Sequence, residues 1–205
     1  MVNRLRTPDF TRLTKTLQGG QADAVPLIEL GIHPSIKDAL LGRPVLTLRD
    51  DCDVMAALGY DFVKIQPGIR FEINAATRPS THQPGDMTAT SREWAPEGGG
   101  LITSWADFER YPWPAPSDID YRRFEEARTA LPDGMGVIGQ YGDIFTVAWE
   151  LMGFQNFAIA LYEQPDLVKA IYDRVEGLIL SMFKTMASCE IVGALWFSDD
   201  IAYTA

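Results

Sequence analysis

Cysteine and histidine are both scarce in this sequence. The chain has two cysteines and two histidines among its 205 residues, and Cys52 lies far from Cys189. Two distant cysteines give no disulfide framework, so a reducing cytoplasm is the expected compartment. Neither His33 nor His82 has a cysteine at ligand spacing. The sequence therefore predicts no metal site formed by its own residues.

Long hydrophobic runs and positive charge are also lacking. No apolar run approaches the length needed to span a membrane, and the first residues contain no hydrophobic signal region. The formal net charge is -10, because 18 Lys and Arg face 28 Asp and Glu. Nucleic acids and anionic membrane surfaces both attract basic faces. We therefore expect neither nucleic acid nor a membrane as a partner.

What the sequence does contain is an alternation of apolar runs and helical segments, clearest in its last third. Apolar runs at 137–141 and 191–198 enclose helical segments at 143–152 and 154–162 and a long helix that begins at Pro165. The long helix has one apolar stripe, which predicts core packing: Leu167, Ile171, Val175, Leu178, Met182 and Met186. A strand–helix–strand crossover of this kind predicts a parallel sheet.

Earlier parts of the chain supply more elements of the same kind. Residues 25–30 and 62–66 read as two further strands, and helices are expected at 10–17, 35–41, 50–58, 104–111 and 117–131. The predicted fold is a single α/β domain over 1–205, roughly the first half of a (β/α)8 TIM barrel with about four parallel strands. Because a complete barrel takes about 250 residues, we expect an N-terminal fragment that is inactive alone.

Residues 70–103 differ from this pattern. They are polar, contain Gly98-Gly-Gly100 and alternate weakly, with hairpin strands expected at 71–74 and 87–90. The glycines are not followed by the Lys-Ser/Thr pair of a phosphate-binding loop. We interpret the segment as an insertion or lid within the domain.

In parallel α/β folds the chemistry gathers at the carboxyl ends of the strands. Lys64 points either into a pocket or at a neighbouring carboxylate such as Glu29, and one of Asp199 and Asp200 should face the pocket because strand side chains alternate. His33 is either a ligand contact or a solvated loop residue. The candidate residues are Asp199, Asp200 and Glu29 as catalytic carboxylates, with His33, Lys64, Gln66, Gln140, Tyr141 and Tyr203 as substrate-binding residues.

Several short motifs, in this order, resemble one superfamily. They are Val25-Pro-Leu-Ile-Glu29, Tyr111-Pro-Trp-Pro114, Gly136-Val-Ile-Gly139, Phe145-Thr146, Leu151-Met-Gly153, Pro165-Asp-Leu-Val168 and Ser198-Asp-Asp-Ile-Ala202-Tyr203. Together the chain resembles the uroporphyrinogen decarboxylase superfamily. The resemblance implies a (β/α)8 barrel that binds a large tetrapyrrole or corrinoid at the carboxyl end. Members include the cofactor-free decarboxylase itself and cobalamin-dependent methyltransferases, which move a methyl group between a corrinoid and a thiol.

Departures from the decarboxylase pattern favour the methyltransferase-like branch. Where the decarboxylases have an arginine-rich stretch, this chain has Glu29-Leu-Gly-Ile-His33, and a substrate with eight carboxylates needs bidentate cations. Gln66 lies near the position at which the decarboxylases have an aspartate, and Glu150 lies near the position of their tyrosine. Three alternatives stay open: uroporphyrinogen decarboxylase, a carboxy-lyase of porphyrin biosynthesis; a non-catalytic tetrapyrrole-binding module; and an unrelated barrel hydrolase that uses Glu29 and Asp200.

The resemblance also sets the expected cofactors and partners. We expect no cofactor held by this chain. Zinc is implied only through residues beyond Ala205, where the ligands of the resembled methyltransferases would follow. The corrinoid would be a substrate or a group carried by a partner corrinoid protein.

Overall fold

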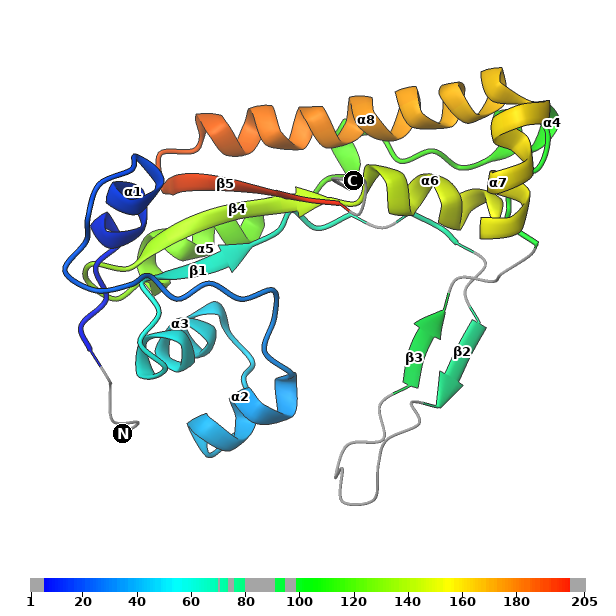
Figure 1. The fold of residues 1–205 in the computed structure, drawn as a ribbon. Helices are drawn as coiled ribbons and strands as arrows, with labels where there is room; N and C mark the ends of the chain where they lie inside the picture. Colours follow the sequence, from blue (N-terminus) through cyan, green and yellow to red (C-terminus); the bar gives the residue numbers. More distant parts are fainter. Residues whose placement is uncertain (1–5, 70, 74–75, 80–90, 95–98, 200–205) are drawn as a thin grey trace. The chain divides into compact units, whose positions relative to one another are not determined.

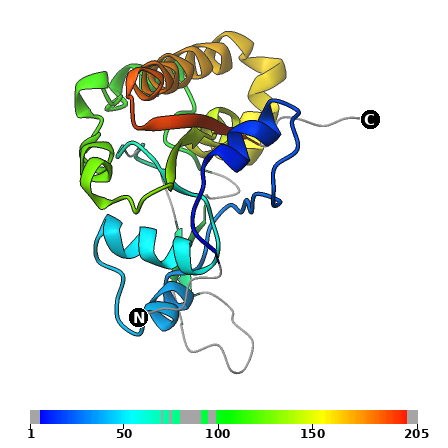
Figure 2. The ribbon, with the colours of Figure 1, turned by 90° about the vertical axis from the view of Figure 1, so that its left-hand side faces the viewer.

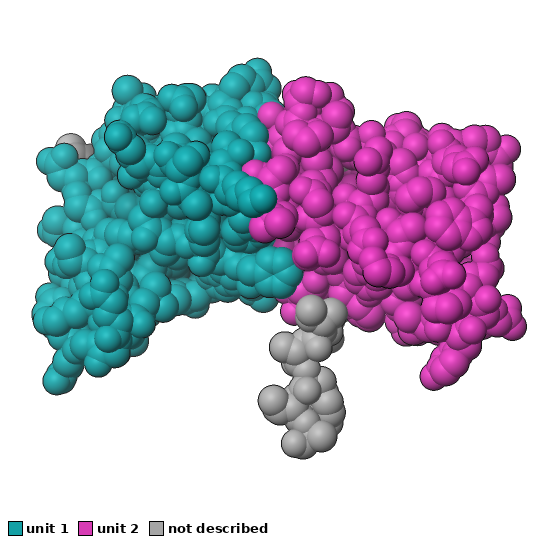
Figure 3. All heavy atoms as spheres, turned by 90° about the horizontal axis from the view of Figure 1, so that it is seen from above, with its two compact units in different colours: residues 1–68, 120–141, 183–197 teal, residues 69–119, 142–182, 198–205 magenta. Residues whose placement is uncertain are grey.

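The computed structural model describes residues 6–69, 71–73, 76–79, 91–94 and 99–199 (Figure 1). The chain forms two compact units (Figure 3). Unit 1 comprises residues 1–68, 120–141 and 183–197, and unit 2 comprises residues 69–119, 142–182 and 198–205.

A three-stranded sheet forms the centre of unit 1. Its strands are β1 (Phe62–Ile65), β4 (Gly136–Gly142) and β5 (Val192–Ser198), in the order β1-β4-β5, and only the last residues of β4 and β5 belong to unit 2. β1 and β4 are parallel, with Phe62 opposite Gly136, and Figure 1 shows β5 running in the same direction. The predicted mixed α/β fold with a parallel sheet is therefore confirmed, with three strands among the described residues.

The helices of unit 1 follow the predicted segments closely. They are α1 (Thr11–Leu17), α2 (Pro34–Leu41), α3 (Leu48–Ala57) and α5 (Arg122–Ala130). The α3 helix begins earlier than expected because Thr47 and Asp50 form a capping box, in which Asp50 is the N3 residue rather than the cap. Gly42 and Gly59 end α2 and α3 with positive φ of 73° and 85°.

Unit 2 is mostly helical. It contains α4 (Trp105–Arg110), the 3₁₀ helix η1 (Pro116–Asp118), α6 (Ile144–Met152), α7 (Phe154–Glu163) and the first part of α8 (Pro165–Ser188), which continues into unit 1. All six positions of the predicted α8 stripe are buried, with at most 5% exposure. No single described helix is long and apolar enough to cross a membrane; α6 and α7 meet that test only as a joined pair bent by 95°.

An antiparallel pair forms within residues 70–103, although its strands differ from the predicted ones. They are β2 (Ala76–Pro79) and β3 (Ser91–Trp94), with Ala76 opposite Trp94. The predicted strand at 71–74 is wrong as far as it is described, because 71–73 are irregular, and 87–90 lie outside the described residues.

The predicted strand at 25–30 is also wrong. This segment is irregular, and Val25 and Leu30 are 80% and 73% exposed. Among the described residues, its backbone makes no hydrogen bond to another backbone group. Pro26 has no N–H with which to form a hydrogen bond to a neighbouring strand. Because the apolar side chains of the segment stay largely in water, little hydrophobic stabilisation is available to hold it against the edge of β1.

The amino end of the sheet is closed by four residues that we call the N-terminal clamp: Arg6, Asp9, Phe10 and Arg12. Asp61, fully buried just before β1, accepts hydrogen bonds from Arg6 (2.8 Å), the Asp9 N–H (2.9 Å) and Arg12 (2.8 Å). The Phe10 ring lies where Gly136 and Gly193 have no side chain, since a Cβ at either would come within 2.3 Å of it. Figures 1 and 2 show α1 beside the amino ends of β4 and β5.

Candidate functional site

One side of the sheet changes from apolar to polar along the strands. We call this side the inner face: Phe62 and Lys64 of β1, Ile138 and Gln140 of β4, and Ala194 and Trp196 of β5. At the amino end, Phe62 and Ile138 form a buried cluster with Leu13. Toward the carboxyl ends, Lys64, Gln140 and Trp196 place a cation, an amide and an aromatic ring on the same face.

Lys64 is the most constrained polar side chain of the inner face. Its Nζ donates hydrogen bonds to the main-chain oxygens of Glu29 (2.6 Å) and Leu30 and lies 4.9 Å from the centre of the Trp196 ring. Burial lowers the pKa of Lys64, and the nearby charge of Glu29 works against that shift. The predicted alternatives were a pocket or the Glu29 carboxylate; among the described residues, the ammonium instead binds main-chain carbonyls of the 25–30 segment.

Glu29 lies beside this lysine but is not tied to it by an ion pair among the described contacts. The effect of its charge reaches Tyr60, whose pKa is raised first by burial and then by Glu29. Glu29, Tyr60 and Lys64 therefore form one electrostatic group beside the inner face. A change in the charge of Glu29 would therefore alter the pKa of both Tyr60 and Lys64.

The two glutamines lie at the ends of neighbouring strands. Ile65 is opposite Gly139 in the β1–β4 register, so Gln66 and Gln140 follow at the same level. Gln140 is buried, with 7% exposure, whereas Gln66 is exposed and Tyr141 is half-buried. An exposed amide beside a buried one can hydrogen-bond a polar ligand without contributing charge.

Two other predicted residues have local structural roles. The His33 Nδ1 accepts a hydrogen bond from the Ser35 N–H and caps α2. The Asp199 Oδ2 accepts one from the Phe145 N–H at 2.9 Å, at the first turn of α6 in unit 2. Asp200 and Tyr203 lie outside the described residues.

Unit 2 contains a second group of acidic residues, after the end of β4. Asp143 has a φ of 65°, and it is the one non-glycine residue with positive φ among the described part of the chain. Glu150, two turns along α6, is partly buried; burial and then the charge of Asp143 raise its pKa. Such strain and such pKa shifts are common near functional sites, but these two residues alone define no chemistry.

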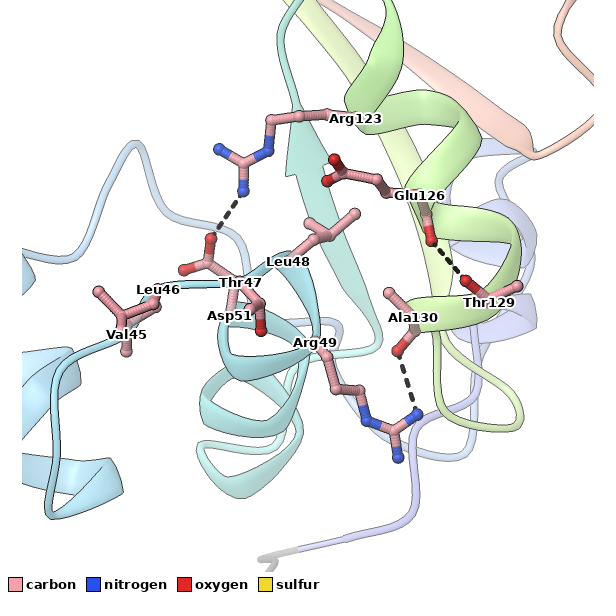
Figure 4. A pocket seen from close by; sticks show the side chains of 10 residues that line it. All are labelled: Val45, Leu46, Thr47, Leu48, Arg49, Asp51, Arg123, Glu126, Thr129 and Ala130. Atoms are coloured by element: carbon pink, nitrogen blue, oxygen red, sulfur yellow. Dashed lines mark hydrogen bonds and ion pairs between the residues drawn. The ribbon is translucent and has the colours of Figure 1, made fainter.

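A separate cavity of about 590 Å³ lies between α3 and α5 in unit 1 (Figure 4). Contacts between the two helices border it: Arg123 pairs with Asp51 at 2.9 Å, and Arg49 donates to the Ala130 carbonyl at 3.3 Å. Those arginines hold the helices together. None of the predicted site residues lines this cavity.

The described residues do not fit a zinc ion. Among residues 6–69, 71–73, 76–79, 91–94 and 99–199, no three His, Cys, Asp or Glu side chains come together as a possible metal site.

Trp196 is the inner-face residue that sequence reasoning missed. Strand alternation contained the signal, because Trp196 lies two residues before Ser198 on β5 and shares a face with Ala194. The candidates were polar residues at the ends of strands, and Trp196 is an aromatic residue within a strand, so it was not among them.

Comparison with known proteins gives a likeness of fold. No family model matches the chain, and no curated protein matches it in sequence. Among solved structures, it is similar to a methyltransferase from Methanosarcina mazei, with a TM-score of 0.51 and 15% sequence identity. The match covers 96% of this chain and 60% of that protein, so the chain spans less than two thirds of the methyltransferase.

Proposed function

We propose that this chain is part of a methyltransferase-like barrel enzyme of the uroporphyrinogen decarboxylase type, which binds a corrinoid at the carboxyl ends of its strands. The observation that supports the proposal most is the likeness to the Methanosarcina mazei methyltransferase, which extends over 96% of the chain. The parallel sheet supports it as well, because Gln66 and Gln140 follow the β1–β4 register to the carboxyl ends of those strands, where such folds bind ligands.

The chemistry of the inner face suits a corrinoid. Trp196 offers a ring on which a flat macrocycle can stack, and Gln66 and Gln140 offer amides for the amide-bearing side chains of a corrinoid. A bound corrinoid would supply a metal-carried methyl group. This chain's residues would hold and orient the ring, and Lys64 would keep the 25–30 segment beside it.

Uroporphyrinogen decarboxylation remains the second candidate because of the family resemblance, but the charges favour it less. Its substrate carries eight carboxylates, and the cation on the inner face is Lys64, whose ammonium already binds two carbonyls. Arg6 and Arg12 are bound to Asp61 at the opposite end of the strands. The net charge of -10 adds a repulsive field against an octa-anion.

A titration with two macrocycles tests the proposal. Hydroxocobalamin and uroporphyrin are added separately to the purified chain, and binding is followed by the absorbance of each macrocycle. We expect cobalamin to bind, Trp196→Leu and Gln140→Leu to weaken it, and Trp105→Leu, which removes an exposed aromatic residue of unit 2, to leave it unchanged.

The outcomes separate the candidates. Tight binding of uroporphyrin without cobalamin would support the carboxy-lyase. A lack of binding to both, by a chain whose circular dichroism shows a folded α/β protein, would overturn the proposal.

A further inference from the structure

Residues 21–32, which we call the strap, are held in place by neither a sheet nor the core. Among the described residues, the strap backbone makes no hydrogen bond to another backbone group. Val25, Leu27, Ile28 and Leu30 are 80%, 41%, 51% and 73% exposed. Something other than secondary structure or burial must therefore fix its position.

Three cationic side chains of unit 1 hold the strap. Arg12 pairs with Asp23 at 2.8 Å, and Arg6 reaches the Val25 carbonyl with both terminal nitrogens at 3.4 Å, which is long for a hydrogen bond. Farther along the strap, Lys64 donates to two successive carbonyls, those of Glu29 and Leu30. Among the described hydrogen bonds and ion pairs, those of Lys64 alone tie this second half to the sheet.

We propose that Lys64 is a positioning residue whose ammonium holds the second half of the strap against the inner face of the sheet, and that loss of its charge releases this half. The ammonium contacts the strap and the Trp196 ring at once, so its charge acts on both. Hydrogen bonds from a charged donor are roughly twice as strong as those from a neutral one. A neutral amine also loses its attraction to the face of the indole ring.

The surroundings of Lys64 make this charge adjustable. Burial lowers its pKa from the ordinary lysine value; Lys37 contributes in the same direction, and Glu29 opposes them. Burial and then the charge of Glu29 raise the pKa of Tyr60, which therefore stays neutral to higher pH than an ordinary tyrosine. The second half of the strap should thus be held at neutral pH and released as the pH rises through the lowered pKa of Lys64.

Limited proteolysis of the ligand-free chain tests the inference. The rate of subtilisin cleavage within residues 21–32 is measured by mass spectrometry from about pH 7 to about pH 10.5 and divided by the rate for a short peptide at each pH. Loss of the two charged hydrogen bonds should raise strap cleavage on the order of tenfold with pH in the wild type.

The variants separate charge from structure. Lys64→Arg should stay slowly cleaved at every pH, because a guanidinium keeps its charge. Lys64→Met should be cleaved rapidly at every pH. Lys184→Met, which changes an exposed lysine of α8 in the same unit, should follow the wild type.

Two results would overturn the inference. One is a wild-type cleavage rate that does not change with pH while circular dichroism shows an intact fold. The other is a Lys64→Arg chain whose cleavage rises with pH as the wild type does, which would place the titrating group elsewhere. If Lys64→Met does not fold, the wild type and Lys64→Arg decide alone. Because no ligand is present, this test is independent of the proposed function.

Discussion

Replacement of Asp61 by asparagine should destabilise unit 1 strongly. The carboxylate is fully buried and accepts hydrogen bonds from two guanidinium groups and one backbone N–H. An asparagine of the same shape keeps one acceptor oxygen, turns a donor toward the other partner and removes the negative charge that pairs with Arg6, whereas Arg12 keeps its second partner, Asp23. The N-terminal clamp would therefore lose most of its attachment to β1.

The magnitude follows from the burial of the group. Removing one partner of a buried ion pair costs about 3–5 kcal/mol of unfolding free energy. The Arg6 and Arg12 side chains keep 23% and 13% of their surface exposed, so water can partly solvate them after the substitution. We therefore expect Asp61→Asn to cost about 3 kcal/mol, and Asp61→Ala, which also leaves the Asp9 N–H without an acceptor, about 4 kcal/mol.

Urea unfolding followed by far-ultraviolet circular dichroism measures these costs. Asp133→Asn, at an exposed aspartate of the same unit, is the matched control and should stay within about 0.5 kcal/mol of the wild type. A triple substitution of Arg6→Met, Arg12→Met and Asp61→Leu should recover much of the loss, because no buried charge is left unbalanced. Should Asp61→Asn unfold like the control, the clamp does not depend on this carboxylate.

Three further predictions concern other parts of the chain and use the same unfolding assay or thiol labelling. Gly136→Ala should lower the unfolding free energy by about 2 kcal/mol, because its Cβ would lie 2.3 Å from the aromatic ring of Phe10. Gly177→Ala, with open space around it in α8, should instead raise the unfolding free energy by about 0.5–1 kcal/mol. Burial raises the pKa of Cys52 to about 12, so a thiol reagent at neutral pH should label Cys189 in the native protein and Cys52 only after unfolding. Asp199→Ala should cost about 1 kcal/mol, as α6 loses a side-chain acceptor at its first turn; an unchanged midpoint would refute that capping role.

Much of the fold could be predicted because local signals and burial agree. The α8 stripe is buried at each predicted position, and the helix predicted at 104–111 forms as α4, with Ser104 as its cap. Runs 137–141 and 191–198 become β4 and β5 within one residue at either end. In each case the apolar period, the cap and the turn residue all indicate the same element.

The errors occur where tertiary contacts decide the structure. Residues 25–30 carry a strand-like apolar run, yet side chains from β1 and the clamp, rather than a ladder, hold this segment. Nothing local marks Asp61 as a buried charge, because its two guanidinium partners lie more than forty residues earlier in the chain. Trp196 lies beside Lys64 because of the strand order β1-β4-β5, which cannot be read from the local sequence pattern.

The N-terminal clamp also bears on the order of folding. The Phe10 N–H donates a hydrogen bond to the carbonyl of Gly134, and the Phe10 ring packs against Gly193. The clamp therefore completes its contacts only when residues far later in the chain are in place. Contacts of such high sequence separation slow a folding reaction, because a long loop must close before they form. During synthesis on the ribosome, residues 6–13 would emerge well before β5 and lack the Gly193 part of their docking site until β5 has left the exit tunnel, a period in which a chaperone could engage them.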